Sequence, residues 1–112
     1  MSDCLFCKIA AGQIPSKTVY SDDRVFAFED IAPKAPTHVL VIPRRHIPKL
    51  EDAAAEDEAL IGEVVARAAS IAREKGLAHY RLVANNGEGA GQSVFHLHFH
   101  LLGGRPLAWP PG

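Results

Sequence analysis

The sequence predicts one α+β domain in which a five-stranded antiparallel sheet is accompanied by one short and one long helix. Five short apolar stretches have the length and composition of strands, and most are joined by short connections. Only one segment has long helical periodicity, whereas a doubly wound parallel sheet needs a helix at each crossover. The 112 residues can form one core but not separate substrate and cofactor domains, so residues 1–112 are treated as a single domain.

The chain is expected to begin with a short helix that runs through about Ala11. Asp3 is a suitable N-cap residue, and Gly12 is a suitable stop. Such a helix would place Cys4 and Cys7 on one face, because residues three apart are neighbours on a helix surface.

Three strands are expected next. Residues 18–21 and 25–29 read as a hairpin around an Asp-Asp turn. Residues 31–37 contain two prolines and are expected to form a loop, and the apolar run 38–42 is a third strand that Pro43 ends.

Residues 55–75 predict the long helix. Acidic residues cluster at its start, basic residues near its end, and Gly76 follows it. A fourth strand is expected at residues 80–84, and a glycine-rich loop at 85–93 leads into the last strand. The apolar positions that recur at helical spacing are Leu60, Ile61, Val64, Val65, Ala68, Ile71 and Ala72.

The last strand carries the most informative pattern, three histidines at positions 96, 98 and 100. Because side chains alternate between the faces of a strand, His96, His98 and His100 should share one face at steps of about 6.7 Å, while the apolar residues between them face the core. The alternatives are core histidines, a half-exposed strand, or metal binding by all three. The glycine-rich loop immediately before them favours a functional site.

Composition argues against several classes of protein. A net charge of -1, 22% charged residues and 47% hydrophobic residues are ordinary values for a globular protein and do not indicate binding of nucleic acid or membranes. The one basic cluster, Arg44-Arg45 beside His46, is typical of a solvated strand end. The chain has neither a secretory leader pattern at its start nor 18 consecutive apolar residues, so a cytoplasmic location is expected.

The two cysteines, Cys4 and Cys7, form a Cys-x-x-Cys pair. In a reducing compartment such a pair is a metal half-site or a pair of plain thiols more often than a disulfide. A thioredoxin-like role is disfavoured, because its motif follows a strand and no strand can precede residue 4.

The loop at residues 85–93 could hold a phosphate. Gly87, Gly89 and Gly91 let backbone amides approach an anion, and Asn85 and Ser93 add neutral donors. A plain glycine-rich hairpin loop is the alternative. The dinucleotide fingerprint and the P-loop do not fit, because no helix follows the glycines and no Gly-Lys-Ser/Thr is present.

Residues 91–102 match the His-φ-His-φ-His-φ-φ signature of the histidine-triad (HIT) nucleotide-binding proteins, in which φ is apolar. The resemblance extends over most of the chain. Residues 28–31, 35–38 and 41–43, together with the final Trp-Pro-Pro-Gly, look like the purine nucleoside phosphoramidase (HINT) branch.

This resemblance implies a HIT-like fold whose sheet continues across a homodimer, with the tail of each chain near the other's pocket. It also implies hydrolysis of purine nucleoside 5′-phosphoramidates, with AMP or GMP joined to an amine or a lysine. The middle histidine, His98, would attack the α-phosphorus to form a nucleotidyl-histidine that water hydrolyses. The alternatives are a dinucleoside polyphosphate hydrolase, a nucleotide-binding scaffold without activity, and a metal protein that uses all three histidines.

The resemblance also assigns roles to residues. The catalytic set it implies is His98, His100, Ser93 and His38. Asp30 would hold the ribose hydroxyls, and apolar side chains would flank the purine. The substrate-binding set it implies is Phe28, Asp30, Ile31, Asn85, Gly91, Gln92, Ser93, His98, His100 and Trp109.

Some relatives place a Cys-x-x-Cys pair, a downstream histidine and the first triad histidine around a structural zinc ion. The corresponding residues here are Cys4, Cys7, His46 and His96. Zinc bound there would stabilise the fold and would not be required for the chemistry; unliganded reduced thiols are the alternative. The sixth histidine, His79, matches no motif. The expected partners are therefore a purine nucleotide and a second copy of the chain, without nucleic acid or membrane.

Overall fold

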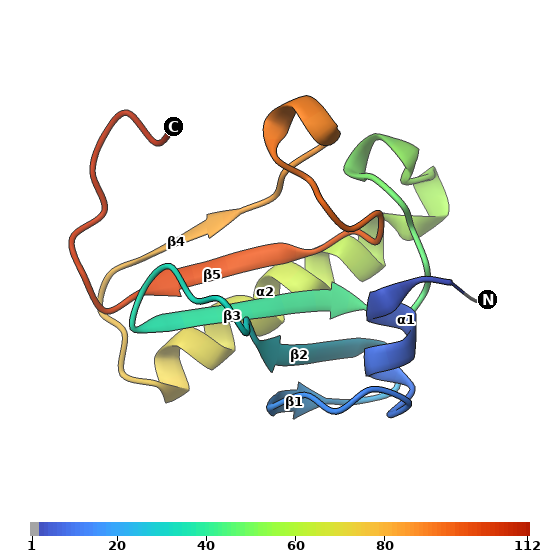
Figure 1. Cartoon of the computed structure of the whole chain (residues 1–112), viewed down its shortest axis with the longest axis horizontal. Helices are drawn as coiled ribbons and strands as arrows, with labels where there is room; N and C mark the ends of the chain where they lie inside the picture. Colours follow the sequence, from blue (N-terminus) through green and yellow to red (C-terminus); the bar gives the residue numbers. More distant parts are fainter. Residues whose placement is uncertain (1–2) are drawn as a thin grey trace.

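The structure, a computed structural model, describes residues 3–112 and contains one five-stranded sheet. The strands lie in the order β1-β2-β3-β5-β4, and every neighbouring pair is antiparallel. The helix α2 covers one face of the sheet, and α1 lies on the other (Figure 1). The elements are α1 Leu5–Ala10, β1 Thr18–Ser21, β2 Val25–Glu29, β3 Thr37–Pro43, α2 Glu58–Glu74, β4 Tyr80–Val83 and β5 Phe99–Gly103, with short 3₁₀ turns at Leu50–Asp52, Ala55–Asp57 and Glu88–Ala90.

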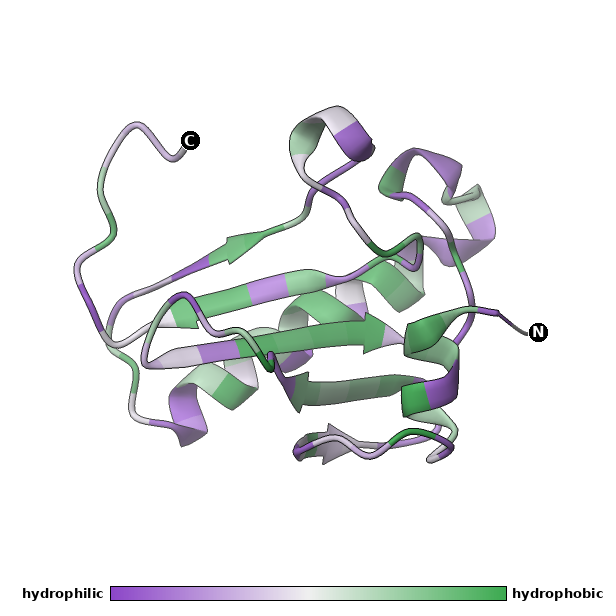
Figure 2. Ribbon diagram, in the orientation of Figure 1, coloured by the Kyte–Doolittle hydropathy of each residue, from purple (hydrophilic) through white to green (hydrophobic). Residues whose placement is uncertain are grey.

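The sheet separates two apolar clusters, because side chains alternate between its faces. The larger cluster joins α2 to residues such as Val39, Val41 and Leu101, and the smaller one joins α1 to Phe26, Leu40 and neighbouring side chains. The central strands are mainly apolar, with hydrophilic bands on β3 and β5 (Figure 2). The predicted α+β class, the five strands and the long helix are confirmed.

The first helix begins differently from the prediction. Its N-cap is Cys4, whose Sγ accepts a hydrogen bond of 3.3 Å from the backbone N–H of Cys7, so Asp3 is not the cap. This contact fixes the thiol of Cys4 at the start of α1. The predicted turn at the other end is present, because Gly12 adopts a φ of +80° that favours glycine.

The last strand is shorter than predicted. β5 begins at Phe99, so only His100 of the three histidines lies inside it. The ladder between β3 and β5 ends with the pair Val41 and Phe99. Two residues further along β3 lies Pro43, which has no N–H to donate to a ladder. His96 and His98 therefore precede the strand. His96 lies in a bend, and the backbone N–H of Leu97 donates to Ile47 over 2.6 Å instead of pairing with β3.

The other boundaries differ by a few residues. Residues 55–57 form a 3₁₀ turn before α2, β3 spans Thr37–Pro43, and β4 ends at Val83. No helix within residues 3–112 is both long and apolar enough to cross a membrane.

Candidate active site

The three histidines lie on the face of the sheet that α1 covers. The ring of Phe6 in α1 lies 6.1 Å from the ring of His96 and 5.0 Å from that of His98, between centroids. The rings of His98 and His100 are 5.0 Å apart. The predicted alternation therefore persists, but His96 and His98 are buried, at 0% and 6% exposed.

The middle histidine presents one free nitrogen. Nδ1 of His98 lies 2.7 Å from the backbone oxygen of His96. A carbonyl oxygen can only accept, so Nδ1 carries the proton, and in the neutral ring Nε2 keeps its lone pair. Burial lowers the pKa of His98 from its ordinary value, which favours this neutral form. The ring therefore has the tautomer that a nucleophile at Nε2 requires.

His100 is hydrogen-bonded to a fourth histidine. Nδ1 of His38 lies 3.0 Å from the backbone N–H of Lys34, which donates to it, so the proton of the neutral ring is on Nε2. That Nε2 lies 2.9 Å from Nδ1 of His100 and 3.4 Å from a carboxylate oxygen of Asp30. His38 therefore donates to His100, whose own proton is then on Nε2. Burial, followed by the neighbouring His98 and His38, lowers the pKa of His100 to about 4.

The glycine-rich loop uses part of its hydrogen-bonding capacity internally. The amide of Gly91 donates to Glu88, and the amide of Gln92 donates to Gly87. Gly91 has a φ of +99°, a backbone conformation that favours glycine, and the exposed Ser93 follows two residues later. The backbone N–H groups of Gly91 and Gln92, two residues of the substrate-binding set that the resemblance implies, are therefore already hydrogen-bonded within the loop.

A pocket of about 580 Å³ lies beside Asp30 and is lined by Ile31, Lys17 and neighbouring residues. Its volume is typical of small-molecule sites. Ile31 is 98% exposed, so its side chain is free to cover a ligand. Phe28, in contrast, is buried against Phe6, with ring centroids 5.3 Å apart, and does not line this pocket.

Trp109 lies outside this cluster. Its side chain is 80% exposed, and its ring centroid is 6.0 Å from the guanidinium of Arg81. The tail runs beside β4, away from α1 (Figure 1). His79 is exposed, and no contact with the histidine row is observed among the described residues.

Four side chains converge at the α1 end of the histidine row. One donor atom from each of Cys4, Cys7, His46 and His96 lies within 4.8 Å of all the others. Nδ1 of His96 is 3.4 Å from Sγ of Cys4, 3.5 Å from Sγ of Cys7 and 3.3 Å from Nδ1 of His46. Tetrahedral zinc with bonds of about 2.3 Å to sulfur and about 2.0 Å to nitrogen would place its ligands roughly 3.3–3.8 Å apart.

The chemistry of these donors also fits a metal ion. Nε2 of His96 donates to the backbone oxygen of Pro43 over 2.7 Å, so Nδ1 of the neutral ring has its lone pair free. Burial and the adjacent Cys4 raise the pKa of Cys7 to about 11, which a divalent cation would oppose by stabilising the thiolate. These four residues can therefore hold a metal ion such as zinc.

Sequence analysis alone missed three residues that orient these rings. Phe6 packs on His96 and His98, the amide of Lys34 fixes the tautomer of His38, and the carbonyl of Pro43 fixes that of His96. Phe6 could have been singled out as the aromatic residue between the two cysteines. The other two act through the main chain, which side-chain patterns do not report.

The sequence profile of the HIT domain family matches residues 11–107. The chain is 50% identical over 107 residues to the purine nucleoside phosphoramidase of Escherichia coli K12, covering 94% of this chain and 90% of that protein. It is also 50% identical over 111 residues to an uncharacterized HIT-like protein of Synechocystis sp., covering 98% and 97% of the two chains.

Solved structures agree with these sequence relationships. A HIT family hydrolase from Legionella pneumophila superposes with a TM-score of 0.96 at 49% identity, covering 98% of this chain and all of that one. A histidine triad protein from Clostridium difficile superposes with a TM-score of 0.93 at 44% identity, covering 96% of each chain.

Proposed function

The chain belongs to the HIT domain family of hydrolases, and from that premise we propose that it cleaves purine nucleoside 5′-phosphoramidates through a nucleotidyl-histidine intermediate. The observation that carries this proposal is the tautomer of His98, whose Nδ1 is held by a backbone carbonyl while Nε2 is free to attack phosphorus. The 50% identity to a phosphoramidase supports the choice of a P–N bond.

The proposed reaction has two steps. Nε2 of His98 bonds to the α-phosphorus while the P–N bond breaks, and the amine leaves with the Nε2 proton of His100. Water then attacks the same phosphorus and gives a proton back to His100, which releases the nucleoside monophosphate and returns the electron pair to Nε2 of His98. Imidazole leaves readily once protonated, so the covalent intermediate does not trap the enzyme.

The neighbouring groups have distinct proposed roles. His100 and Ser93 donate hydrogen bonds toward the phosphoryl group or the leaving amine, and His38 supports His100 by donating to its Nδ1. Asp30 binds the ribose hydroxyls. Ile31 contacts the purine, and Asn85 lies beside the sugar-phosphate.

The direct test is hydrolysis of adenosine 5′-phosphoramidate in the presence of a metal chelator, with guanosine phosphoramidates and diadenosine polyphosphates in the same panel. The proposal expects the highest kcat/KM on a phosphoramidate, and activity that survives chelation. Preference for a dinucleoside polyphosphate would favour the alternative hydrolase. Binding of AMP without turnover of any substrate would favour a scaffold, and loss of turnover on chelation would favour a catalytic metal.

We further propose that Cys4, Cys7, His46 and His96 hold a structural zinc ion. Their convergence and their spacing of 3.3–3.5 Å between the measured donor pairs support it. A bound ion would cross-link α1 to the segments before β5 and after β3. Elemental analysis of the purified protein should give about one zinc per chain.

A homodimer is proposed on different grounds. β4 lies at one edge of the sheet, where its outer backbone groups are available to pair with another strand. Tyr80 on β4, Val65 on α2 and Trp109 are apolar side chains that are 41%, 38% and 80% exposed, respectively. Sedimentation at micromolar concentration should give the mass of two chains; a monomer would contradict the proposal.

A further inference from the structure

Gln92, in the glycine-rich loop, is the most thoroughly hydrogen-bonded buried side chain outside the histidine clusters. It is 2% exposed. Its Oε1 accepts from the backbone N–H of Gly87 over 2.8 Å, and its Nε2 donates to the backbone oxygens of Pro48 and Val94 over 2.8 and 3.0 Å. Both protons of the amide are therefore used, so this side chain has no donor left for a substrate phosphate.

These bonds join three parts of the backbone. Gly87 and Gln92 are paired twice, because the amide of Gln92 also donates to the oxygen of Gly87 over 3.1 Å. The carboxamide of Gln92 thus closes the turn of residues 87–92 on itself. Its other end fastens this turn to Pro48, two residues after His46, and to Val94, next to Ser93.

We propose that Gln92 is a positioning residue that sets the location of Ser93 and the loop relative to His98, and that it is not a ligand of the substrate. This role rests on the proposed function, because it supplies the reason that Ser93 needs a fixed place. Buried donors and acceptors without partners are costly, so a side chain that fails to satisfy all three backbone groups will displace the loop. A displaced donor weakens stabilisation of the transition state more than binding of the nucleotide.

Gln92→Glu is the sharpest substitution, since it keeps the shape and replaces NH₂ by oxygen. As a carboxylate, the new side chain would face two carbonyl oxygens with no proton to offer. As a neutral acid, it would restore one of the two lost hydrogen bonds. We therefore expect kcat to fall about 10-fold or more at pH 8 and to recover partly near pH 5.5, relative to the unchanged protein at each pH.

Asn86→Asp is the matched control. Asn86 also joins the loop to the 3₁₀ turn at residues 50–52, through two hydrogen bonds with Glu51, but its side chain is exposed. The same amide-to-acid change in water should alter kcat by less than about 2-fold and should show no recovery at low pH. Gln92→Leu, which cannot regain a hydrogen bond, should lose activity at both pH values.

Two measurements separate positioning from a simple loss of stability or from direct binding. The dissociation constant for AMP should change less than about 3-fold in Gln92→Glu, while kcat falls. Amide hydrogen exchange at residues 85–93 should be faster in Gln92→Glu than in the wild type at pH 8, after correction for the intrinsic rate, and closer to it at pH 5.5.

The outcomes are decisive in both directions. Wild-type kcat in Gln92→Glu at every pH, or a loss that is confined to AMP binding, would overturn the positioning role. If the wild type does not hydrolyse the phosphoramidate, the proposed function fails, and the exchange measurement still decides whether Gln92 holds the loop. If Gln92→Leu does not fold, Gln92→Glu at the two pH values carries the test.

Discussion

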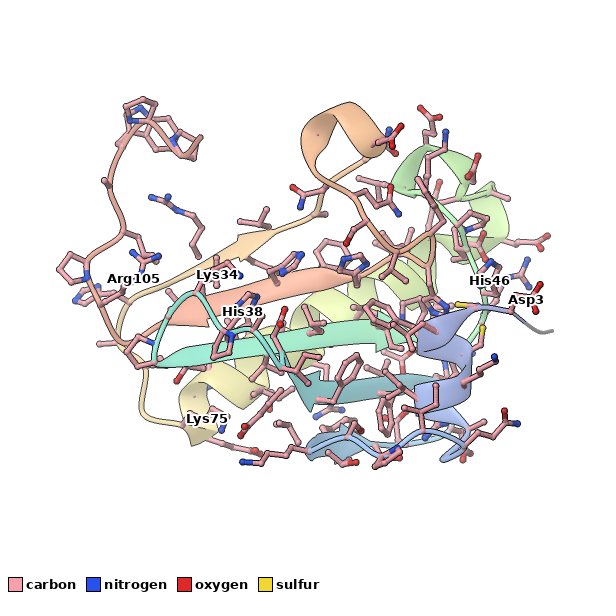
Figure 3. The ribbon with its side chains drawn as sticks, viewed as in Figure 1. Asp3, Lys34, His38, His46, Lys75 and Arg105 are labelled. Atoms are coloured by element: carbon pink, nitrogen blue, oxygen red, sulfur yellow. The ribbon has the colours of Figure 1, made fainter. Side chains whose placement is uncertain are left out.

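The two ends of the histidine row are built from similar residues and yet have different chemistry. At the α1 end, Nδ1 of His96 shares a centre with two thiols and His46, at distances of 3.3–3.5 Å. At the other end, His38 and His100 lie 2.9 Å apart beside Asp30. Figure 3 shows His46 near α1 and His38 over β3, well separated along the sheet.

The position of one proton explains the difference. At the α1 end, the oxygen of Pro43 accepts the Nε2 proton of His96, so a lone pair points at the centre of the cluster. At the other end, the amide of Lys34 donates to Nδ1 of His38, so the Nε2 proton points at the centre instead. A ring nitrogen with a free lone pair can bind a cation, whereas a ring nitrogen that has a proton can only donate a hydrogen bond. Asp30, His38 and His100 also lie close enough together to hold a metal ion, but the main-chain partners of the two rings favour a cation at the α1 end.

His98 lies between these two ends, and its replacement should have the largest effect. His98→Ala is expected to lower kcat on adenosine 5′-phosphoramidate by on the order of a thousand-fold or more, because the attacking nitrogen is gone. Binding of AMP should persist, since Asp30 and Ile31, the residues proposed to contact the ribose and the purine, are unchanged. Rapid quenching of the wild type with a slow substrate should give an acid-labile adenylated histidine by mass spectrometry. Near-wild-type turnover of His98→Ala would refute the covalent mechanism.

Cys4→Ser tests the α1 end. Serine can still cap α1, so the substitution removes a metal ligand with little change in helix capping. The variant should lose its zinc, and Tm should fall by about 10 °C, since metal binding contributes directly to folding. kcat/KM at 25 °C should change by less than about 10-fold. The control is wild-type protein treated with a chelator, which should have the same Tm as the variant. If zinc-free wild type has the Tm of the untreated protein, the zinc site is refuted.

The sequence predicts the fold well because its signals are local. The spacing of apolar residues identifies α2, and alternation places His96, His98 and His100 on one face even where the strand ladder ends. The start of β5 could not be predicted, because it depends on backbone partners that are distant in sequence: Phe99 pairs with Val41 of β3, whereas the N–H of Leu97 donates to Ile47 outside the sheet.

The site is predicted less completely, for a physical reason. Residue types identify candidate nucleophiles and metal ligands, but the tautomer of each ring depends on its backbone partner. Gln92 illustrates the limit most clearly. The family resemblance includes it in the substrate-binding set, and its side chain is buried and bound to three backbone groups. A pattern of residue types cannot show which way a carboxamide points.

His100 allows the other end to be tested by pH. Burial lowers its pKa in the folded protein to about 4, below the value near 6.5 of an exposed histidine. The unfolded chain therefore binds more protons between these values, so stability falls as pH decreases from about 6.5 to about 4. Between pH 7 and pH 4.5 the wild type should lose about 2 kcal/mol more than His100→Gln, by urea denaturation. Parallel pH profiles would contradict burial of a neutral His100.

The smallest expected effect concerns the hydrogen bond from His38 to His100. His38→Phe removes this donor from a buried position while keeping a planar ring, and should lower kcat about 10-fold with little change in KM. His38→Gln retains an N–H that can reach His100, and should stay within about 3-fold of the wild type. Zinc content should be unchanged in both variants, because the metal ligands lie at the opposite end of the row. Equal losses of kcat in the two variants would mean that the volume of the His38 ring matters and its proton does not. A loss of zinc in either variant would mean that the two ends of the histidine row are not independent.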